Sequence, residues 1–309
     1  MIPNISICIP AYKRVNFLQR LLHSIEFQKY KNFEVIITDD SSEDCEVENL
    51  IKFNSYTFKI RYFKNPIPLG SPRNWLECIS KANGSWIKIM HDDDYFLDSS
   101  SLDVFASHIK NDIDCIFSGY YAVYDNGSVI DNTISKSLFS SIVKSPMKLF
   151  ASNVIGPPSV MMFRNHLQES FDPRLKWIVD WEFYIRLADQ YRLVYIENPL
   201  INVGYSDSQI TNSCFLNPQV EIPETLLFTE KHSKRIFNSI WSYDAWWRLI
   251  RNLKIRQIDQ FLSFSGKLPI NSNILRIIQF QSYFPLSVLN IGFFSKVLMS
   301  LSFLFNKVK

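Results

Sequence analysis

Five aspartates form two clusters that could bind a cation or a polar ligand: Asp39, Asp40, Asp92, Asp93 and Asp94. The pair follows an apolar run at 33–38, and the triplet follows another at 86–90. Three consecutive carboxylates are costly to hold together because like charges raise each other's pKa. A divalent cation removes that cost, and aspartate oxygens suit Mg²⁺ or Mn²⁺. The structural alternatives are a solvated acidic turn for the triplet and an Asx turn or helix cap for the pair.

The strands and helices that the sequence predicts decide where these clusters lie. Apolar runs of strand length at 5–9, 33–38, 58–63, 86–90 and 114–118 alternate with helical patterns. The first two helices have Asn16 and Ser71 as their predicted N-caps, and the third carries Leu102, Phe105 and Ile109. We therefore predict an α/β fold with a Rossmann-like, mostly parallel sheet and helices on both faces. Ligands of such sheets bind at the carboxyl ends of the strands, where both acidic clusters are expected.

The second half of the chain is less regular. It predicts a short helix opened by Ser145, a strand at 159–163, a helix at 181–188 and only helices beyond Cys214. We divide the chain into a catalytic domain, 1–214, and a helical C-terminal region, 215–309.

Composition and charge limit the size of the core and the classes of site that the chain can contain. With 309 residues, 47% of them hydrophobic, the chain can bury one large core or one core with an appendage. Residues 215–309 hold 12 Lys or Arg against 5 Asp or Glu, whereas residues 1–214 hold 21 against 25. The five cysteines are odd in number, widely spaced and never in a C-x-x-C pair, which argues against disulfides and zinc and favours a cytoplasmic setting.

Five segments, taken together in their order, resemble family 2 of the glycosyltransferases. They are SICIPAYKR (6–14), FEVIITDDSS (33–42), PLGSPRN (68–74), HDDDY (91–95) and DWEFYIR (180–186). The resemblance covers residues 1 to about 212. It implies the nucleotide-diphospho-sugar transferase fold. Within the family, the chain resembles bacterial enzymes that build O-antigen and capsule.

The resemblance implies a set of nucleotide-binding residues: Pro10, Tyr12, Asp39, Asp40, Arg73, Asp92 and Asp93. Pro10 and Tyr12 would line the uracil pocket, with Tyr12 stacking on the base, and Asp40 would hydrogen-bond the base with Asp39 close by. Asp92 would approach the ribose, with Asp93 beside it. For Arg73, a contact with the phosphates and a solvated place on the first helical turn both stay open.

The resemblance also implies inverting, non-processive transfer from a UDP-sugar to a hydroxyl of a lipid-linked saccharide. Asp94 would hold Mn²⁺ or Mg²⁺ on the diphosphate. Asp180 matches the general base that takes a proton from the acceptor hydroxyl, and Glu182 is the alternative. As a structural alternative, Asp180 is the N-cap of the helix that it precedes.

The sequence departs from the family in one stretch. Many relatives place a further metal-binding His around 202–211, but 203–207 here reads VGYSD, which leaves the ligand set open. His91 is the only histidine beside the site, and we predict it to be a neighbour and not a ligand. The Q-x-x-R-W motif of processive synthases is absent, which favours single transfer.

The tail contains a strongly apolar segment at 285–305, interrupted by Asn290 and Lys296. It falls short of a clean membrane span. An interfacial helix at the cytoplasmic face of the inner membrane and a core or homo-oligomer interface helix are left as alternatives.

Other function classes fit less well. A nucleotidyltransferase would need a Gly-rich basic loop after the first strand, and a dinucleotide-dependent oxidoreductase would need G-x-G-x-x-G there. The sequence has neither motif at that place. No nucleic-acid-binding module is recognisable, so no nucleic-acid partner is expected. A catalytically inactive scaffold of the same fold stays open because of the missing histidine.

Overall fold

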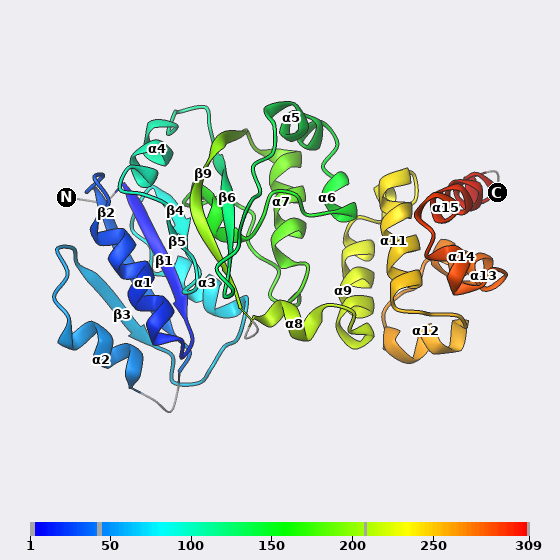
Figure 1. Cartoon of the computed structure of the whole chain (residues 1–309), viewed down its shortest axis with the longest axis horizontal. Coiled ribbons are helices and arrows are strands. Elements are labelled where there is room, and N and C mark those ends of the chain that lie inside the picture. Colours follow the sequence, from blue (N-terminus) through cyan, green and yellow to red (C-terminus); the bar gives the residue numbers. More distant parts are fainter. Residues whose placement is uncertain (1–3, 42–44, 207–208, 308–309) are drawn as a thin grey trace. The chain divides into compact units, whose positions relative to one another are not determined.

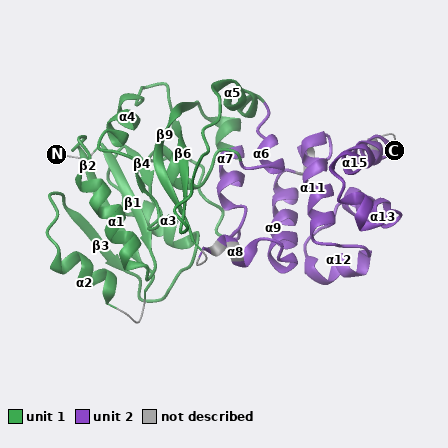
Figure 2. Ribbon diagram, in the orientation of Figure 1, with its two compact units in different colours: residues 1–144, 154–173, 186–207 green, residues 145–153, 174–185, 208–309 purple. Residues whose placement is uncertain are grey.

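The computed structural model describes residues 4–41, 45–206 and 209–307, and the chain divides into two compact units (Figure 2). Unit 1 comprises 1–144, 154–173 and 186–207, and unit 2 comprises 145–153, 174–185 and 208–309. Ser42 and Asp207, which belong to two of the stretches quoted above, lie outside the described residues. The units interleave along the chain, and the functional boundary at 214 stays a prediction.

Unit 1 is built on a nine-stranded sheet (Figure 1). Its strand order is β3-β2-β1-β4-β8-β6-β9-β5, with β7 paired to β6. The strands are β1 Ile5–Ala11, β2 Phe33–Asp39, β3 Ile60–Lys64, β4 Trp86–Ile89, β5 Tyr95–Phe96, β6 Cys115–Tyr124, β7 Val129–Asp131, β8 Met161–Arg164 and β9 Leu193–Tyr205. The pairings make β1, β2, β3, β4, β6 and β9 run in one direction, and β5, β7 and β8 run in the other. The predicted α/β fold with a mostly parallel sheet is confirmed.

The helices of unit 1 cover this sheet. They are α1 Val15–Glu26, α2 Glu46–Phe53, α3 Arg73–Ser80, α4 Ser101–Ser107, α5 Lys136–Lys144 and the 3₁₀ turn η1 Pro158–Val160. Every residue of β1 and β4 is buried, as expected for parallel strands that are covered on both faces. α1 buries the apolar stripe that predicted it, and α3 packs against β1 and β2.

The ends of the elements differ from the predicted ones by a few residues. The N-caps are Arg14 and Pro72, not Asn16 and Ser71, because their carbonyls accept the first i to i+4 bonds of α1 and α3. α4 stops at Ser107, so Ile109 lies outside it, and β3 begins at residue 60. β6 continues to residue 124 because it pairs with β9 over that whole length, which a local pattern does not reveal.

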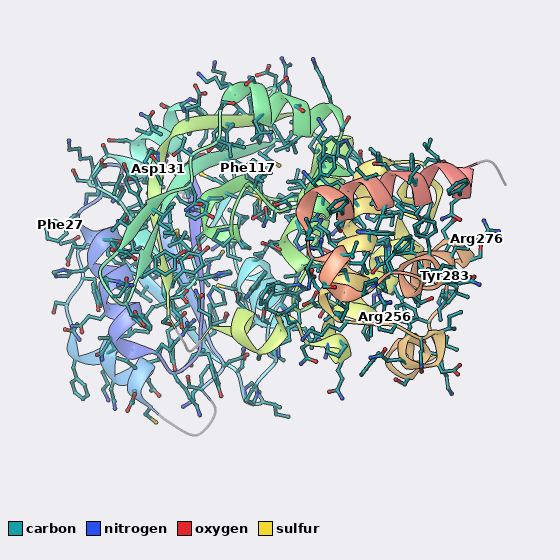
Figure 3. All side chains as sticks on the ribbon, turned by 45° about the vertical axis from the view of Figure 1, so that its right-hand side comes forward. Phe27, Phe117, Asp131, Arg256, Arg276 and Tyr283 are labelled. Atoms are coloured by element: carbon teal, nitrogen blue, oxygen red, sulfur yellow. The ribbon has the colours of Figure 1, made fainter. Side chains whose placement is uncertain are left out.

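Unit 2 is helical, and α7 contributes residues to both units. Its helices are α6 Lys148–Ala151, α7 Val179–Gln190, α8 Ile210–Cys214, α9 Pro218–Lys231, α10 Ser233–Ile236, α11 Ile240–Asn252, α12 Ile258–Ser265, α13 Ser272–Ser282, α14 Leu286–Leu289 and α15 Gly292–Lys307. Trp246 and Trp247 of α11 are buried in unit 2, where α11 packs against α6, α13 and α15. Figure 3 turns these helices toward the viewer. Within the described parts of the chain, no helix has both the length and the apolar character to cross a bilayer.

Candidate active site

The carboxyl ends of β2, β1 and β4 meet at one edge of the sheet, since these parallel strands are neighbours in that order. The turn after β1 therefore contacts both acidic clusters. On one side of it, Asp40 N donates to Ala11 O at 3.0 Å. On the other side, Tyr12 N donates to Asp92 Oδ2 at 3.4 Å. The strand ends thus bring the two clusters to one turn, as the element order predicted.

Arg14, the N-cap residue of α1, pairs with two members of the triplet. Its Nη1 lies 2.7 Å from Asp93 Oδ2, and its Nη2 contacts Asp92 Oδ1. Arg14 ends the first motif, SICIPAYKR, but the sequence alone predicts no role for it. The sequence did offer one indication of this pairing. A basic residue follows the first strand closely, just as the acidic clusters follow the strands at 33–38 and 86–90.

Burial dominates the electrostatics of the triplet, whose three carboxylates are almost completely enclosed. Burial raises the pKa of Asp92 to about 7, although Arg14 opposes the shift. Burial and then the charge of Asp93 raise the pKa of Asp94 well above its usual range. Burial also lowers the pKa of His91 to about 4, so its imidazole is neutral at physiological pH. A neutral imidazole beside carboxylates that repel each other is a donor set suited to a divalent cation.

The geometry around His91 supports such a site. One ligand atom from each of His91, Asp93 and Asp94 can be chosen so that all three lie within 4.8 Å of one another. The buried atoms His91 Nε2 and Asp94 Oδ2 have no hydrogen-bond partner among the described residues. Trp75 packs on the imidazole, with ring centroids 4.7 Å apart. His91 is predicted from the sequence to be only a neighbour, because no two histidines lie at metal-ligand spacing, although it directly precedes the triplet.

Ser159 of η1 contacts both the acidic turn and the strand that precedes it. Ser159 Oγ accepts from His91 N at 2.9 Å, and the carbonyl of Ser159 is contacted by Lys88 Nζ. Lys88 is completely buried in β4, and burial lowers its pKa to about 7. Its ammonium lies 4.8 Å from the ring centre of Phe105. No sequence pattern marks this lysine, because it stands inside an otherwise apolar strand.

Gly204, near the end of β9, approaches the turn from the other side. Its amide donates to Asp94 Oδ1 at 3.1 Å. A Cβ at this position would lie 2.5 Å from the carbonyl oxygen of Asp93, so only glycine allows this approach. Gly204 belongs to 202–211, the stretch in which the family resemblance implies a further metal-binding histidine. Here the backbone of that stretch holds Asp94.

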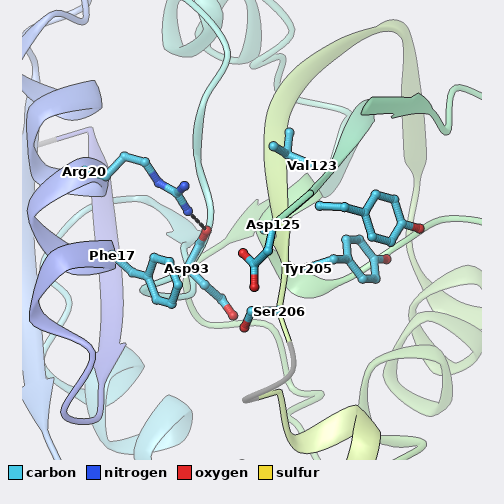
Figure 4. Close-up of a pocket in the computed structure, with 9 residues that line it drawn as sticks. Phe17, Arg20, Asp93, Val123, Asp125, Tyr205 and Ser206 are labelled. Atoms are coloured by element: carbon cyan, nitrogen blue, oxygen red, sulfur yellow. Dashed lines mark hydrogen bonds between the residues drawn. The ribbon is translucent and has the colours of Figure 1, made fainter. Parts of the chain in front are cut away.

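A cavity of about 230 Å³ opens beside Asp93, between the ends of β6 and β9 and the start of α1 (Figure 4). Oxygen atoms of Asp93, Asp125 and Ser206 face the same space. Arg20 forms another wall, where its Nη2 donates to Asp93 O at 2.7 Å and its guanidinium stacks 4.3 Å from the centre of the Tyr95 ring. The cavity thus combines carboxylates, a cation and aromatic faces.

Asp39 and Asp40 organise the loops around the strand ends. Asp39 accepts from Ser41 N and from the Tyr62 hydroxyl, both at 2.8 Å. Asp40 accepts from Asn65 Nδ2 at 2.6 Å, and from the amides of Leu69 at 3.1 Å and Gly70 at 2.8 Å. Both carboxylates are therefore engaged within the protein, and their contact with a nucleobase stays a prediction.

The remaining predicted nucleotide residues differ in exposure. Pro10 is buried in β1, while the Tyr12 side chain is 51% exposed and presents its ring to solvent. Lys13 Nζ lies 5.2 Å from the centre of that ring. Arg73 is exposed at the first residue of α3. Of these residues, Tyr12 offers the free aromatic face that base stacking needs.

Asp180 belongs to unit 2, where it lies in the first turn of α7 and not at its N-cap. Asn153 Nδ2 donates to its Oδ2 at 2.9 Å. Burial raises the pKa of Asp180 to about 7, which suits a general base at neutral pH. Glu182, the alternative base, is completely buried and lies 2.7 Å from Lys231 Nζ.

The turn before α7 is held by a carboxylate that the sequence analysis did not single out. Glu224 of α9 accepts from the amides of Lys176, Trp177 and Ile178 at 2.9, 2.8 and 3.1 Å. These bonds satisfy backbone donors just ahead of the helix and fix where it begins. No local motif marks Glu224, because its partners lie more than 40 residues away in sequence.

Comparison with known sequences gives the chain a family. Residues 6–171 match the model of glycosyl transferase family 2. Abequosyltransferase RfbV of Salmonella typhimurium is 37% identical over 113 residues, which are 36% of this chain and 34% of that protein. WcaA of Escherichia coli, a glycosyl transferase assigned to colanic acid biosynthesis, is 26% identical over 214 residues, 68% of this chain and 76% of that protein. The match to RfbV thus spans about a third of either chain.

Solved structures share the fold. TarS 1–349 of S. aureus in complex with UDP-GlcNAc superposes with a TM-score of 0.59 at 17% identity, covering 89% of this chain and 78% of that one. The mannosyltransferase PcManGT of Pyrobaculum calidifontis, in complex with GDP-Man and Mn²⁺, gives 0.55 at 13% identity, covering 99% and 88%. With a family model that matches more than half of its length and this fold, the chain belongs to glycosyl transferase family 2 and is a glycosyltransferase.

Proposed function

We propose that this enzyme moves a sugar from a UDP-sugar donor to a hydroxyl of a saccharide acceptor in bacterial surface-polysaccharide synthesis. The observation that carries the proposal is the buried group of His91, Asp93 and Asp94 at the strand ends of a family 2 enzyme. The name of RfbV supports sugar transfer, the name of WcaA supports a role in polysaccharide synthesis, and the TarS complex supports a UDP-sugar donor. We further propose that the saccharide acceptor is linked to a lipid.

At the donor, Tyr12 stacks on the base beside Pro10, and Asp40, with Asp39 next to it, closes the base pocket. Asp92 approaches the ribose, and Arg73 faces the phosphates. Asp94, with Asp93 and His91 in reach, is suited to hold Mn²⁺ or Mg²⁺, which supplies positive charge for the departing diphosphate. The unpartnered Asp94 Oδ2 and His91 Nε2 support this assignment.

At the acceptor, Asp180 takes the hydroxyl proton as the acceptor oxygen attacks the anomeric carbon. The new carbon–oxygen bond forms while the bond to the diphosphate breaks, so UDP leaves with the electron pair and the anomeric configuration inverts. One sugar is transferred per encounter. The raised pKa of Asp180 supports its role, because a carboxylate with a pKa near the working pH is the stronger base.

The test is UDP release by the purified enzyme from UDP-glucose, UDP-galactose and their N-acetylated counterparts, with a lipid-linked acceptor mimic, in the presence and absence of Mn²⁺. Asp180→Asn is expected to lose about 10²- to 10⁴-fold in turnover. Asp259→Asn, an exposed aspartate in the first turn of α12, is the matched control and should turn over normally. Equal turnover in the two variants would remove Asp180 from the mechanism. Release that does not depend on metal would remove the metal role of Asp94.

A further inference from the structure

The last helix, α15, exposes most of its large apolar residues and buries two serines. Six large apolar side chains are between 41% and 73% exposed: Phe293, Phe294, Val297, Leu301, Leu304 and Phe305. At about 100° per residue, they lie within about 120° of the helix circumference. The opposite side buries Ser295 and Ser302, together with Met299 and Phe303. This arrangement reverses the usual orientation of a surface helix.

Hydrogen bonds to α11 fix α15 in this orientation. Trp247 Nε1 donates to Ser295 Oγ at 3.0 Å, and Arg251 Nη1 reaches the same oxygen at 3.0 Å. The hydroxyls of Tyr243 and Ser302 lie 2.7 Å apart. Buried indole and phenol groups need such partners, so the small serines must face inward. The apolar stripe is left outside as a consequence.

The segment that contains the exposed stripe carries charge of one sign. From residue 260 to 309 the sequence contains five Lys or Arg and no Asp or Glu. Lys296 is exposed on α15 itself. Arg276 lies on α13, which packs against α15, and both Arg276 and Tyr283 can be located in Figure 3. A second copy of the chain would bring like charge against this region, whereas an anionic surface complements it.

We propose that α15 docks on an anionic lipid bilayer, with its exposed apolar face at the boundary between headgroups and acyl chains. The helix has 16 residues, which is too short to span a bilayer and long enough to lie in its interface. Lys296 and the neighbouring cations approach the lipid phosphates.

The experiment is co-sedimentation of the full chain with vesicles of phosphatidylcholine alone and of phosphatidylcholine mixed with phosphatidylglycerol, without donor or acceptor. Binding is expected on the anionic vesicles and should weaken at high salt. The variant Phe293→Ser/Leu301→Ser/Phe305→Ser is expected to bind about tenfold more weakly, or worse, because the buried apolar area is lost. Lys296→Glu is expected to weaken binding by roughly fivefold or more.

The matched control is Phe27→Ser/Phe53→Ser, which removes two phenylalanines that are 64% and 75% exposed in unit 1. Its vesicle binding should equal that of the unaltered chain. Absence of binding to anionic vesicles, or equal binding by the triple-serine variant, would overturn the proposal. So would light scattering that shows a dimer which the triple-serine variant converts to monomer, because a second copy would then cover the stripe. The measurement needs no catalysis, so its failure leaves the proposed sugar transfer untouched.

Discussion

Replacing Gly204 with alanine is the smallest change that we expect to disturb the cation site. The amide of Gly204 donates to Asp94 Oδ1 at 3.1 Å. A Cβ on Gly204 would lie 2.5 Å from Asp93 O and 3.2 Å from Arg20 Nη2. Arginine can swing away, but the Asp93 oxygen belongs to the backbone. The substitution therefore forces the end of β9 and the acidic turn apart.

The size of the effect follows from that distance. To reach ordinary contact at 3.4 Å, the two backbone segments must separate by about 0.9 Å. A metal site tolerates displacements of only about 0.5 Å. Overpacking of this kind costs about 1–3 kcal/mol of the free energy of unfolding. Loss of the hydrogen bond to a ligand is expected to lower metal affinity about 10- to 100-fold.

The assay is UDP release as a function of Mn²⁺ concentration, with thermal unfolding measured in parallel. Gly204→Ala should need more Mn²⁺ for half-maximal turnover and should unfold at a lower temperature. Gly292→Ala is the matched control because no atom lies within 4 Å of its added Cβ. A Gly204→Ala enzyme with unchanged Mn²⁺ dependence would refute the idea that this close approach positions Asp94.

Three further predictions concern the donor pocket, the triplet and the base. Tyr12→Ala should raise the KM for the donor by roughly 5- to 150-fold, since base–aromatic stacking contributes about 1–3 kcal/mol. It should leave thermal stability nearly unchanged because the ring is exposed. Arg14→Met should lower the free energy of unfolding of the metal-free protein by about 2 kcal/mol or more at neutral pH, because Asp92 and Asp93 lose the guanidinium that pairs with them. Denaturant titrations measure this loss, and Mn²⁺ should restore part of the stability. The turnover rate should rise with pH through about 7, because Asp180 must lose its proton to act as a base, and a pH profile that stays flat across this range would contradict that role.

The sequence predicted the parts of the fold that depend on local patterns. The alternation of apolar runs and amphipathic helices gave a mostly parallel sheet, and the acidic residues at the ends of 33–38 and 86–90 pointed to the correct edge of it. The late strands were harder. β8 runs antiparallel between β4 and β6, and this insertion depends on pairing between distant segments that no local period records.

At the site, the sequence indicated which residue types matter but not their partners. Glu224 accepts from backbone amides, and Gly204 donates its own amide to the Asp94 carboxylate. In both cases the partner lies far away in the chain, so neither residue carries a recognisable motif. His91 was visible beside the triplet, yet only the folded turn brings its ring near Asp94. The orientation of α15 was likewise hidden, because two buried serines decide which side of an apolar helix faces out.

The central claim is that the turn from His91 to Asp94 binds a divalent cation that holds the nucleotide diphosphate. The most direct measurement is the affinity of UDP by calorimetry, with and without Mn²⁺, for the unaltered enzyme and for Asp94→Asn. We predict that Mn²⁺ tightens UDP binding at least tenfold in the unaltered enzyme and has little effect in the variant. UDP binding that is equally tight without Mn²⁺, or equally strengthened by Mn²⁺ in Asp94→Asn, would contradict the claim.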